Sequence, residues 1–344
     1  MPLPPIDSQL AREALEAPEA ARRQTAANAA VLAALGERLR RAPPPFVVTG
    51  ARGSSDHAAS YGAFVLESLV GRAVASVAPG VASVYGRDLA VKDALFIAVS
   101  QSGQSTDLLR LTDSMARGGA LTVALVNDAA SPLARLCEVV IPLWAGEERA
   151  VAATKSFLLS ALAFLDLAAH WGRSEDARQA VAAAPDALAA ALELDWSGAL
   201  APLAAARGLY VLGRGAGLGP AGEAALKFKE TCGLHAEAFS AAEVIHGPLA
   251  LAGPDLPVLM LGQPDAAAPG AVEAATRMAS YGSPVWSTLA VPGGVLLPAV
   301  AGVPPLLAPL AAVASLYRAL PGLARARGRD PDAPAHLRKV TRTV

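Results

Sequence analysis

Three things are scarce or absent in this 344-residue sequence: cysteine, an excess of basic charge, and an unbroken apolar run. The two cysteines, Cys137 and Cys232, exclude a disulfide-stapled scaffold and a zinc site made of cysteines alone. The 29 basic residues are balanced by 30 acidic ones, which argues against a nucleic-acid partner. The sequence begins without the basic and apolar parts of a signal peptide. We therefore expect a protein of a reducing compartment, the cytoplasm, that binds no nucleic acid.

One long stretch without charged side chains, residues 278–317, resembles a membrane segment at first sight. Six prolines interrupt it, and a spanning helix needs about 20 consecutive apolar residues. The stretch instead predicts a buried strand, a loop and a buried helix that starts near Pro304 or Pro305. We expect no contact with a membrane.

Apolar runs alternate with polar turns and helix-forming stretches along the chain. The runs at residues 46–49, 94–99, 121–126 and 139–143 are each typical of a buried strand, and the pattern restarts at residues 209–212. Strands that alternate with helices predict parallel sheets covered on both faces. The sequence thus predicts an α/β protein of two tandem doubly wound parallel-sheet domains, flavodoxin-like and three-layered.

The predicted domains are residues 1–190, with a leading helix, and residues 191–344. Residues 8–41 predict that helix, with a break at Pro18, and residues 172–206 predict a long helix and a linker. Residues 321–344 are rich in arginine and are predicted to be loop-like.

A run of hydroxyl and amide side chains follows the predicted strand 94–99. Parallel sheets bind ligands at the carboxyl ends of their strands, and backbone N–H groups at a helix start can hold a phosphate. An earlier turn, with Ser54 and Ser55, could converge on the same place. The alternative is a turn whose serines only cap helices. The run consists of Ser100, Gln101, Ser102, Gly103, Gln104, Ser105 and Thr106.

Charged residues gather around the predicted helix that ends near Lys229. Lys227 and Glu230 are three apart and share a helix face, and His235 and His246 follow. A carboxylate and an imidazole near one ligand can move protons at neutral pH, although each alone is compatible with a solvated surface. No metal-binding spacing is present, so we expect no metal.

Lysine is rare, with 24 arginines against five lysines. A site that keeps lysine is a candidate for amine chemistry, because guanidinium cannot deprotonate or form a Schiff base. Lys339, near the end of the chain, is such a candidate, although a solvated tail lysine is equally compatible with the pattern.

Eight motifs in order along nearly the whole chain make the sequence resemble the sugar-isomerase (SIS) family. It is similar to the isomerase half of glutamine–fructose-6-phosphate aminotransferases and to stand-alone glucosamine-6-phosphate deaminases of that fold. The motifs include Gly53-Ser54-Ser55, SQSGQSTD at 100–107, Glu148 with VAATK at 151–155, ALKFKE at 225–230, HAEAF at 235–239, HGPLAL at 246–251 and the segment around Lys339.

The resemblance implies a homodimer with shared active sites and a role for each matching residue. Glu230 would shuttle a proton between carbons 1 and 2, and His246, supplied by the partner subunit, would open the sugar ring. Lys339 would form a Schiff base with the keto sugar, and Lys227 would assist near carbons 1 and 2. Glu148 and Ala152 would line the pocket. The phosphate would be held by Ser55, Ser100, Gln101, Ser102 and Ser105.

Departures from the synthase pattern favour a deaminase. The sequence begins almost directly with the isomerase part, so we expect no glutaminase domain; Gln104 and Arg52 replace the usual Glu and Cys. The implied reaction converts glucosamine 6-phosphate to fructose 6-phosphate and ammonia, and calls for no metal, nucleotide or organic cofactor. The alternatives are a fructosamine-6-phosphate deglycase, another amino-sugar-phosphate isomerase, and a non-catalytic sugar-phosphate sensor.

Overall fold

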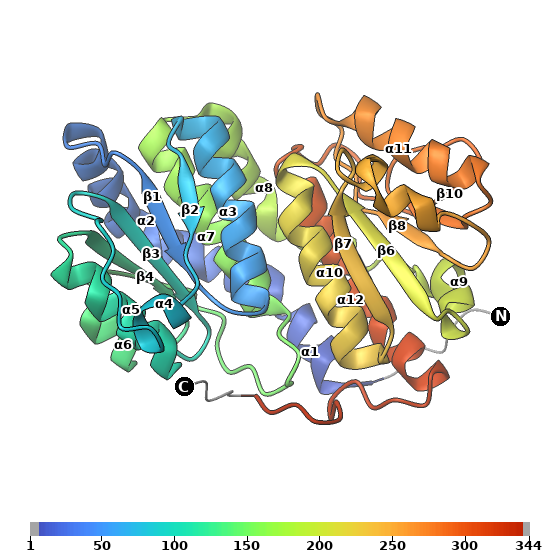
Figure 1. Ribbon diagram of the computed structural model, residues 1–344, viewed down its shortest axis with the longest axis horizontal. Coiled ribbons are helices and arrows are strands. Elements are labelled where there is room, and N and C mark those ends of the chain that lie inside the picture. The colour runs from blue at the N-terminus through green and yellow to red at the C-terminus, as the bar shows by residue number, and fades with distance from the viewer. Residues whose placement is uncertain (1–6, 340–344) are drawn as a thin grey trace. The chain divides into compact units, whose positions relative to one another are not determined.

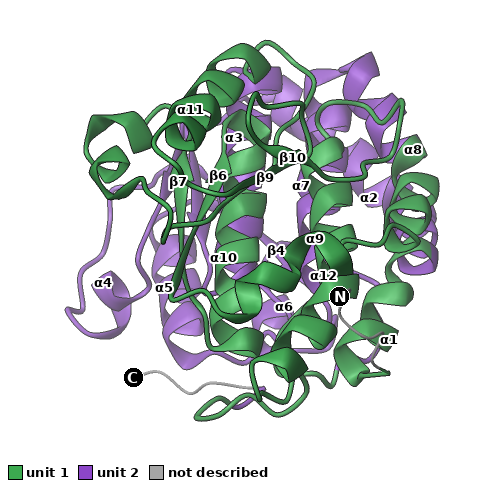
Figure 2. Ribbon diagram, turned by 90° about the vertical axis from the view of Figure 1, so that its right-hand side faces the viewer, with its two compact units in different colours: residues 1–18, 149–154, 183–337 green, residues 19–148, 155–182, 338–344 purple. Residues whose placement is uncertain are grey.

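The computed structural model describes residues 7–339 and divides into two compact units (Figure 2). Among the described residues, unit 2 consists of 19–148, 155–182 and 338–339, and unit 1 contains the others. The chain passes between the units more than once, because residues 149–154 belong to unit 1. The predicted domain boundary after residue 190 stays a prediction.

Unit 2 is built on a five-stranded parallel sheet with the order β2-β1-β3-β4-β5. Apolar side chains of α5 and α6 pack on one face of this sheet, against residues such as Phe96 and Ala124. On the other side α3 packs along α7, which is buried over nearly its whole length (Figure 1). The strands are β1 (Val47–Gly50), β2 (Val74–Ser76), β3 (Leu95–Ser100), β4 (Leu121–Val126) and β5 (Val139–Pro142). The helices are α2 (Ala17–Arg41), α3 (Ser54–Val70), α4 (Gly80–Ser83), α5 (Thr106–Arg117), α6 (Pro132–Leu136) and α7 (Lys155–Gly172).

Unit 1 repeats this plan with the strand order β10-β9-β8-β6-β7, again entirely parallel. Helix α11 packs on one face, against Leu212 and Met260, while α10 contacts β6, β7 and α12 (Figure 1). The strands are β6 (Gly208–Gly213), β7 (His235–Ser240), β8 (Val258–Met260), β9 (Val285–Ser287) and β10 (Val295–Leu296). The helices are α1 (Gln9–Leu15), α9 (Ser197–Leu200), α10 (Leu218–Cys232), α11 (Ala268–Ser280) and α12 (Ala308–Ala326), with short 3-10 turns η1 (Ala201–Ala204), η2 (Gly215–Gly217), η3 (Val244–His246) and η4 (Pro248–Leu251). Helix α8 (Glu175–Leu192) begins in unit 2 and enters unit 1 at residue 183.

Both sheets have one strand order when their strands are numbered along the chain, namely 2-1-3-4-5. This is the flavodoxin-like doubly wound order, and its ligand-binding switch point lies between the first and third strands. The predicted fold of two tandem doubly wound domains is therefore confirmed. In unit 2 the switch point lies between the ends of β1 and β3.

The C-terminal segment differs from its prediction in one place. Residues 321–326 were expected to be loop-like, but α12 continues through Pro321 to Ala326. Proline removes one helical N–H, yet Leu316, Leu320 and Leu323 are fully buried, and this burial outweighs the lost hydrogen bond. The stretch 278–317 contains the end of α11, β9, β10, a loop and the start of α12. Among residues 7–339, no helix has the length and apolar character needed to span a membrane.

Stability should depend on pH through Asp166, a buried carboxyl on α7. Burial raises the pKa of Asp166 from 3.8 to about 6. Its neighbour His170 has a pKa lowered by burial and by two arginines, so it supplies no compensating charge at neutral pH. Because the folded state binds this proton more tightly than the unfolded state, stability falls as pH rises from about 4 through 6.

We therefore expect Asp166→Asn to raise the free energy of unfolding at pH 7.5, by about 1–3 kcal/mol. At pH 4 the gain should shrink to less than about 1 kcal/mol, because the carboxyl is then protonated in the folded state and about half protonated in the unfolded state. Thermal melting of the variant and the parent protein at the two pH values checks this, and an equal effect at both would contradict the assigned cause.

Candidate active site

Two polar turns meet at the switch point of unit 2. Ser54 and Ser55 begin α3 directly after β1, and the segment 100–105 joins β3 to α5. Because β1 and β3 are adjacent parallel strands, both turns lie at the same edge of the sheet. The sequence prediction that these serines converge on one edge therefore agrees with the arrangement of the strands.

The hydroxyls in these turns fall into two groups. Ser100 accepts a hydrogen bond from the Gly103 N–H at 3.0 Å, and Ser102 accepts one from the Gln104 N–H at 3.4 Å, so both shape their own turn. Gly103 has a positive φ of 62°, and a Cβ there would lie 2.2 Å from the Ser131 hydroxyl, so only glycine fits.

The remaining side chains are available for a ligand. The starts of α3 and α5 have no side-chain cap, although Ser105 stands at the cap position of α5. Within residues 7–339, the side chains of Ser55, Gln101 and Ser105 make no hydrogen bond. Helix capping, the alternative role for these serines, is therefore absent at Ser105. The N-termini of α3 and α5, whose partial positive charge favours anions, lie at the same edge.

A third turn at this edge carries Glu148. The loop after β5 is tied to Asn127, at the end of β4, by two hydrogen bonds of 2.8 Å, to Gly146 and from Ala145. Glu148 follows with a fully buried carboxylate that accepts hydrogen bonds from the Ser156 N–H at 3.1 Å and the Ser156 hydroxyl at 2.6 Å. Ser156, at the start of α7, thereby fixes the orientation of Glu148.

Lys339 reaches this carboxylate from the C-terminal segment. Its Nζ lies 3.0 Å from Glu148 Oε2, and its side chain is 23% exposed. The ion pair holds an amine at a defined place in unit 2, although Lys339 is only five residues from the end of the chain. The lysine that the sequence singled out is therefore partly buried and paired within this unit, and its role as a reactive amine stays a prediction.

Unit 1 contains a second charged cluster, on α10. Lys227 is fully buried, and its Nζ contacts Glu230 Oε2 and lies 3.4 Å from Glu223 Oε1. The hydroxyl of Tyr317, from α12, donates to Glu223 Oε1 at 2.8 Å. Glu230 is the exposed member, at 21% of its side chain. In this cluster the Glu230 carboxylate is therefore partly exposed to solvent, while the Lys227 ammonium is fully buried.

The other two candidates in unit 1 lie in different surroundings. His246 is exposed in η3, beside the exposed apolar side chains of Ile245 and Leu251. Ala152 is fully buried with Leu10 and Ala150 in a small apolar cluster. Unit 1 therefore holds Lys227, Glu230, His246 and Ala152, while the hydroxyl turns, Glu148 and Lys339 belong to unit 2.

Sequence reasoning missed several partners of these residues. Glu223 stands four residues before Lys227 and seven before Glu230, so the helical spacing could have identified it. Tyr317 and Ser156 come from other elements, and no local pattern points to them. The ion pair of Arg52 with Asp107, at 2.8 Å across the two polar turns, was also missed.

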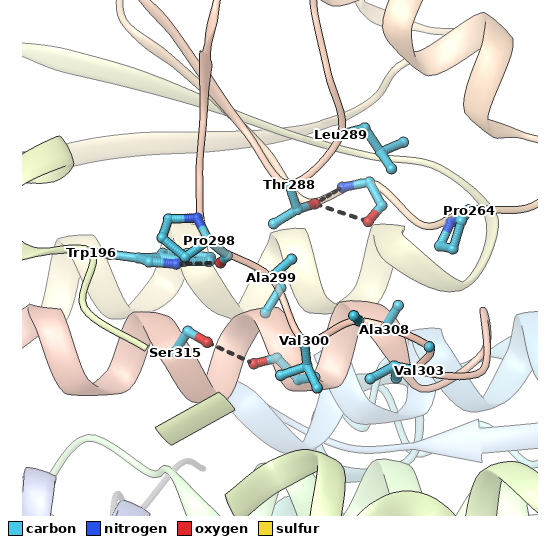
Figure 3. Close-up of a pocket in the computed structure, with 15 residues that line it drawn as sticks. Trp196, Pro264, Thr288, Leu289, Pro298, Ala299, Val300, Val303, Ala308 and Ser315 are labelled. Carbon is cyan, nitrogen blue, oxygen red and sulfur yellow. Dashed lines mark hydrogen bonds between the residues drawn. The ribbon is translucent and has the colours of Figure 1, made fainter. Parts of the chain in front are cut away.

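A cavity of about 270 Å³ lies in unit 1 beyond β8 and β9 (Figure 3). Its lining is mostly apolar, and its polar groups are already hydrogen-bonded: Trp196 to Pro298, Thr288 to Gly262 and Ser315 to Ala191. None of the candidate residues lines it, and it offers nothing to bind a phosphate. Across the described chain, no three His, Cys, Asp or Glu side chains gather as metal ligands would.

Comparison with known proteins identifies the family of the chain. The family model of the SIS domain matches residues 45–170 and 202–282. A glutamine–fructose-6-phosphate aminotransferase of Aeropyrum pernix is 33% identical over 318 residues, which cover 86% of this chain and 50% of the relative. The chain thus spans about half the length of the curated relatives that it matches.

Solved structures match over nearly the full chain. A Silicibacter pomeroyi protein provisionally named a phosphosugar isomerase is 43% identical, with a TM-score of 0.89 and coverage of 95% of this chain and 100% of that one. A Thermotoga maritima glucosamine-6-phosphate deaminase shares the fold at 20% identity, with a TM-score of 0.77 over 98% and 100% of the two chains. The resemblance seen in the sequence is confirmed, and the chain belongs to the SIS domain family.

Proposed function

We propose that this protein is a glucosamine-6-phosphate deaminase. It would convert glucosamine 6-phosphate and water to fructose 6-phosphate and ammonia. The observation that carries the proposal is the edge of unit 2, where free hydroxyls, uncapped helix N-termini and the amine of Lys339 belong to one compact unit. The first two suit a sugar phosphate and the third suits its carbonyl carbon.

Binding would begin at the phosphate. Ser55, Gln101 and Ser105 would donate to its oxygens, while Ser100 and Ser102 hold the turn in shape. Ser54, beside Ser55, would contribute its position at the start of α3. The partial positive charge at the starts of α3 and α5 favours an anion there. Glu148, fixed by Ser156, would accept from a sugar hydroxyl or from Lys339.

Proton transfer would follow at carbons 1 and 2. His246 would protonate the ring oxygen as the ring opens to the free aldehyde. Glu230 would then remove the proton from carbon 2 and return it to carbon 1, which yields a ketimine at carbon 2. The Lys227 ammonium, beside Glu230, would balance the negative charge that develops on the neighbouring oxygen.

Release of ammonia would complete the reaction. The Lys339 amine would add to carbon 2 of the ketimine and expel ammonia, which leaves a lysine ketimine. Water would then hydrolyse this bond, giving the ketone of fructose 6-phosphate and the free amine. The ion pair between Lys339 and Glu148 must break before the amine can react, so this pair would belong to the enzyme before substrate binds.

We also propose a homodimer in the cytoplasm, with His246 entering the partner's site. The support is the exposure of His246 together with Ile245 at 36% and Leu251 at 66%, because exposed apolar groups around a functional histidine suit an interface. Mass measurement by light scattering tests this, and a monomer at assay concentration would contradict it.

A substrate panel tests the function. The purified protein would receive glucosamine 6-phosphate, galactosamine 6-phosphate or fructosamine 6-phosphate, each without glutamine. The proposal predicts the highest kcat/KM for glucosamine 6-phosphate. Preference for fructosamine 6-phosphate would identify a deglycase, preference for the galactosamine compound a different isomerase, and binding without turnover a sensor; each of these results would overturn the proposal.

A further inference from the structure

Arg52 is the only lysine or arginine in the two polar turns of unit 2, residues 50–57 and 100–107. The same turns carry two carboxylates, Asp56 and Asp107. Hydroxyls and helix N-termini alone would have to hold a phosphate dianion against both negative charges. The charge balance of this edge therefore depends on Arg52.

One edge of the Arg52 guanidinium is fixed in place. Its Nε and Nη2 donate to Asp107 Oδ2 at 3.1 and 2.8 Å. The Asp107 carboxylate is only 1% exposed, and its other oxygen accepts the Leu108 N–H at 2.8 Å. Asp107 is thus a rigid anchor at the start of α5, and it reduces the entropy that Arg52 would lose on binding a ligand.

The other edge of the guanidinium is open. The Arg52 side chain is 52% exposed, and its Nη1 makes no hydrogen bond with any residue between 7 and 339. Arg52 lies three residues before Ser55, and its anchor lies two residues after Ser105. The free N–H groups therefore belong to the same two turns as the free hydroxyls.

The charge of Arg52 also affects the pKa of Asp56, in the same turn. Burial raises the pKa of Asp56, and the Arg52 guanidinium opposes this shift. A cation paired with Asp107 on one edge, with N–H donors left on the other, suits a phosphate because guanidinium binds phosphate oxygens in pairs.

We propose that Arg52 binds the phosphate of the substrate directly and makes the site selective for phosphorylated sugars over uncharged ones. The proposal rests on the proposed sugar-phosphate site of unit 2, and it adds a contact at a position where the synthase pattern has cysteine. Asp107 is a positioning residue that aims the guanidinium.

Binding of inorganic phosphate and of fructose 6-phosphate, measured by calorimetry, tests this without relying on turnover. We expect Arg52→Gln to weaken both about 10- to 100-fold, the range for one lost charge-assisted contact. Binding of fructose, which has no phosphate, should not change. Arg110→Gln is the matched control, because Arg110 is an exposed arginine on α5 that bonds only the Ser83 carbonyl.

Asp107→Asn distinguishes two roles of Arg52: direct contact with the phosphate, and an ion pair that only holds the two turns together. This variant keeps the Arg52 cation and removes its ion pair. Loss of the anchor weakens phosphate binding, but loss of a negative charge near the ligand strengthens it. The dissociation constant for phosphate should therefore change by less than about threefold. Equal losses in Arg52→Gln and Asp107→Asn would show that the pair only holds the turns together and would overturn the proposal. Unfolding temperatures of all three variants verify that they are folded.

The outcomes also separate this inference from the proposed deaminase activity. Phosphate binding that depends on Arg52 without release of ammonia would support the inference and refute the deaminase. Release of ammonia with unchanged binding in Arg52→Gln would do the reverse. Failure of the parent protein to bind any sugar phosphate would overturn both.

Discussion

Replacing Glu230 with glutamine is expected to lower turnover of glucosamine 6-phosphate by about 10²- to 10⁴-fold, the usual contribution of a general base. Glutamine matches the size of glutamate and can still accept a hydrogen bond from Lys227, but it cannot take a proton from carbon 2. Substrate affinity should stay within a few-fold, because the phosphate is held elsewhere. Steady-state kinetics of the variant measures both quantities.

The control for Glu230→Gln is Glu273→Gln, which removes an exposed carboxylate from α11. It changes the net charge equally and should leave turnover unchanged. Because Lys227 is fully buried and loses one of its two charged partners in Glu230→Gln, the unfolding temperature must be compared as well. A folded variant that retains turnover within tenfold would show that another group is the base.

Replacing Lys339 with arginine is expected to lower turnover on the order of 10³-fold or more, as loss of a covalent nucleophile does. Arginine keeps the positive charge opposite Glu148, so the ion pair can persist. Its guanidinium stays protonated and cannot add to carbon 2. The defect should therefore lie in kcat, with little change in sugar-phosphate affinity.

Chemical trapping locates the amine directly. Lys339 Nζ and the ketone of fructose 6-phosphate lose water to form an imine, which borohydride reduces to a stable secondary amine. Mass spectrometry should find the adduct on the peptide that contains Lys339, and not in Lys339→Arg. Lys92→Arg, at an exposed lysine, should still be labelled. Labelling of any of the other four lysines in place of Lys339 would contradict the assignment.

The sequence predicts the fold well where a local pattern is strong. The predicted runs at 94–99 and 121–126 lie within a residue of β3 and β4, because continuous apolar residues are typical of buried parallel strands. Strand β7 was not predicted, because only its first four residues, HAEA, alternate polar and apolar side chains, and charged residues in a short segment are equally typical of a solvated surface. The exposed three-residue strand β2 has no such signal and forms by pairing with β1.

The candidate site is predictable only in part, for a similar reason. Hydroxyl turns and a lysine–glutamate pair on one helix are local patterns, so residues such as Ser105 and Lys227 could be found. Contacts between elements leave no trace in a single sequence. The bond from Tyr317 to Glu223 joins residues 94 positions apart, and that from Lys339 to Glu148 joins residues 191 apart. The burial of Lys227 and the pairing of Lys339 with Glu148 are therefore visible only in the folded structure.

The most direct test of the central claim is the stoichiometry of the reaction without glutamine. The purified protein receives glucosamine 6-phosphate, and ammonia and fructose 6-phosphate are measured together over time. We expect the two to appear in equal amounts, at a rate that falls in both Glu230→Gln and Lys339→Arg. Formation of neither product by a protein that binds the sugar phosphate, or fructose 6-phosphate formed equally fast by Glu230→Gln, would contradict the proposed deaminase.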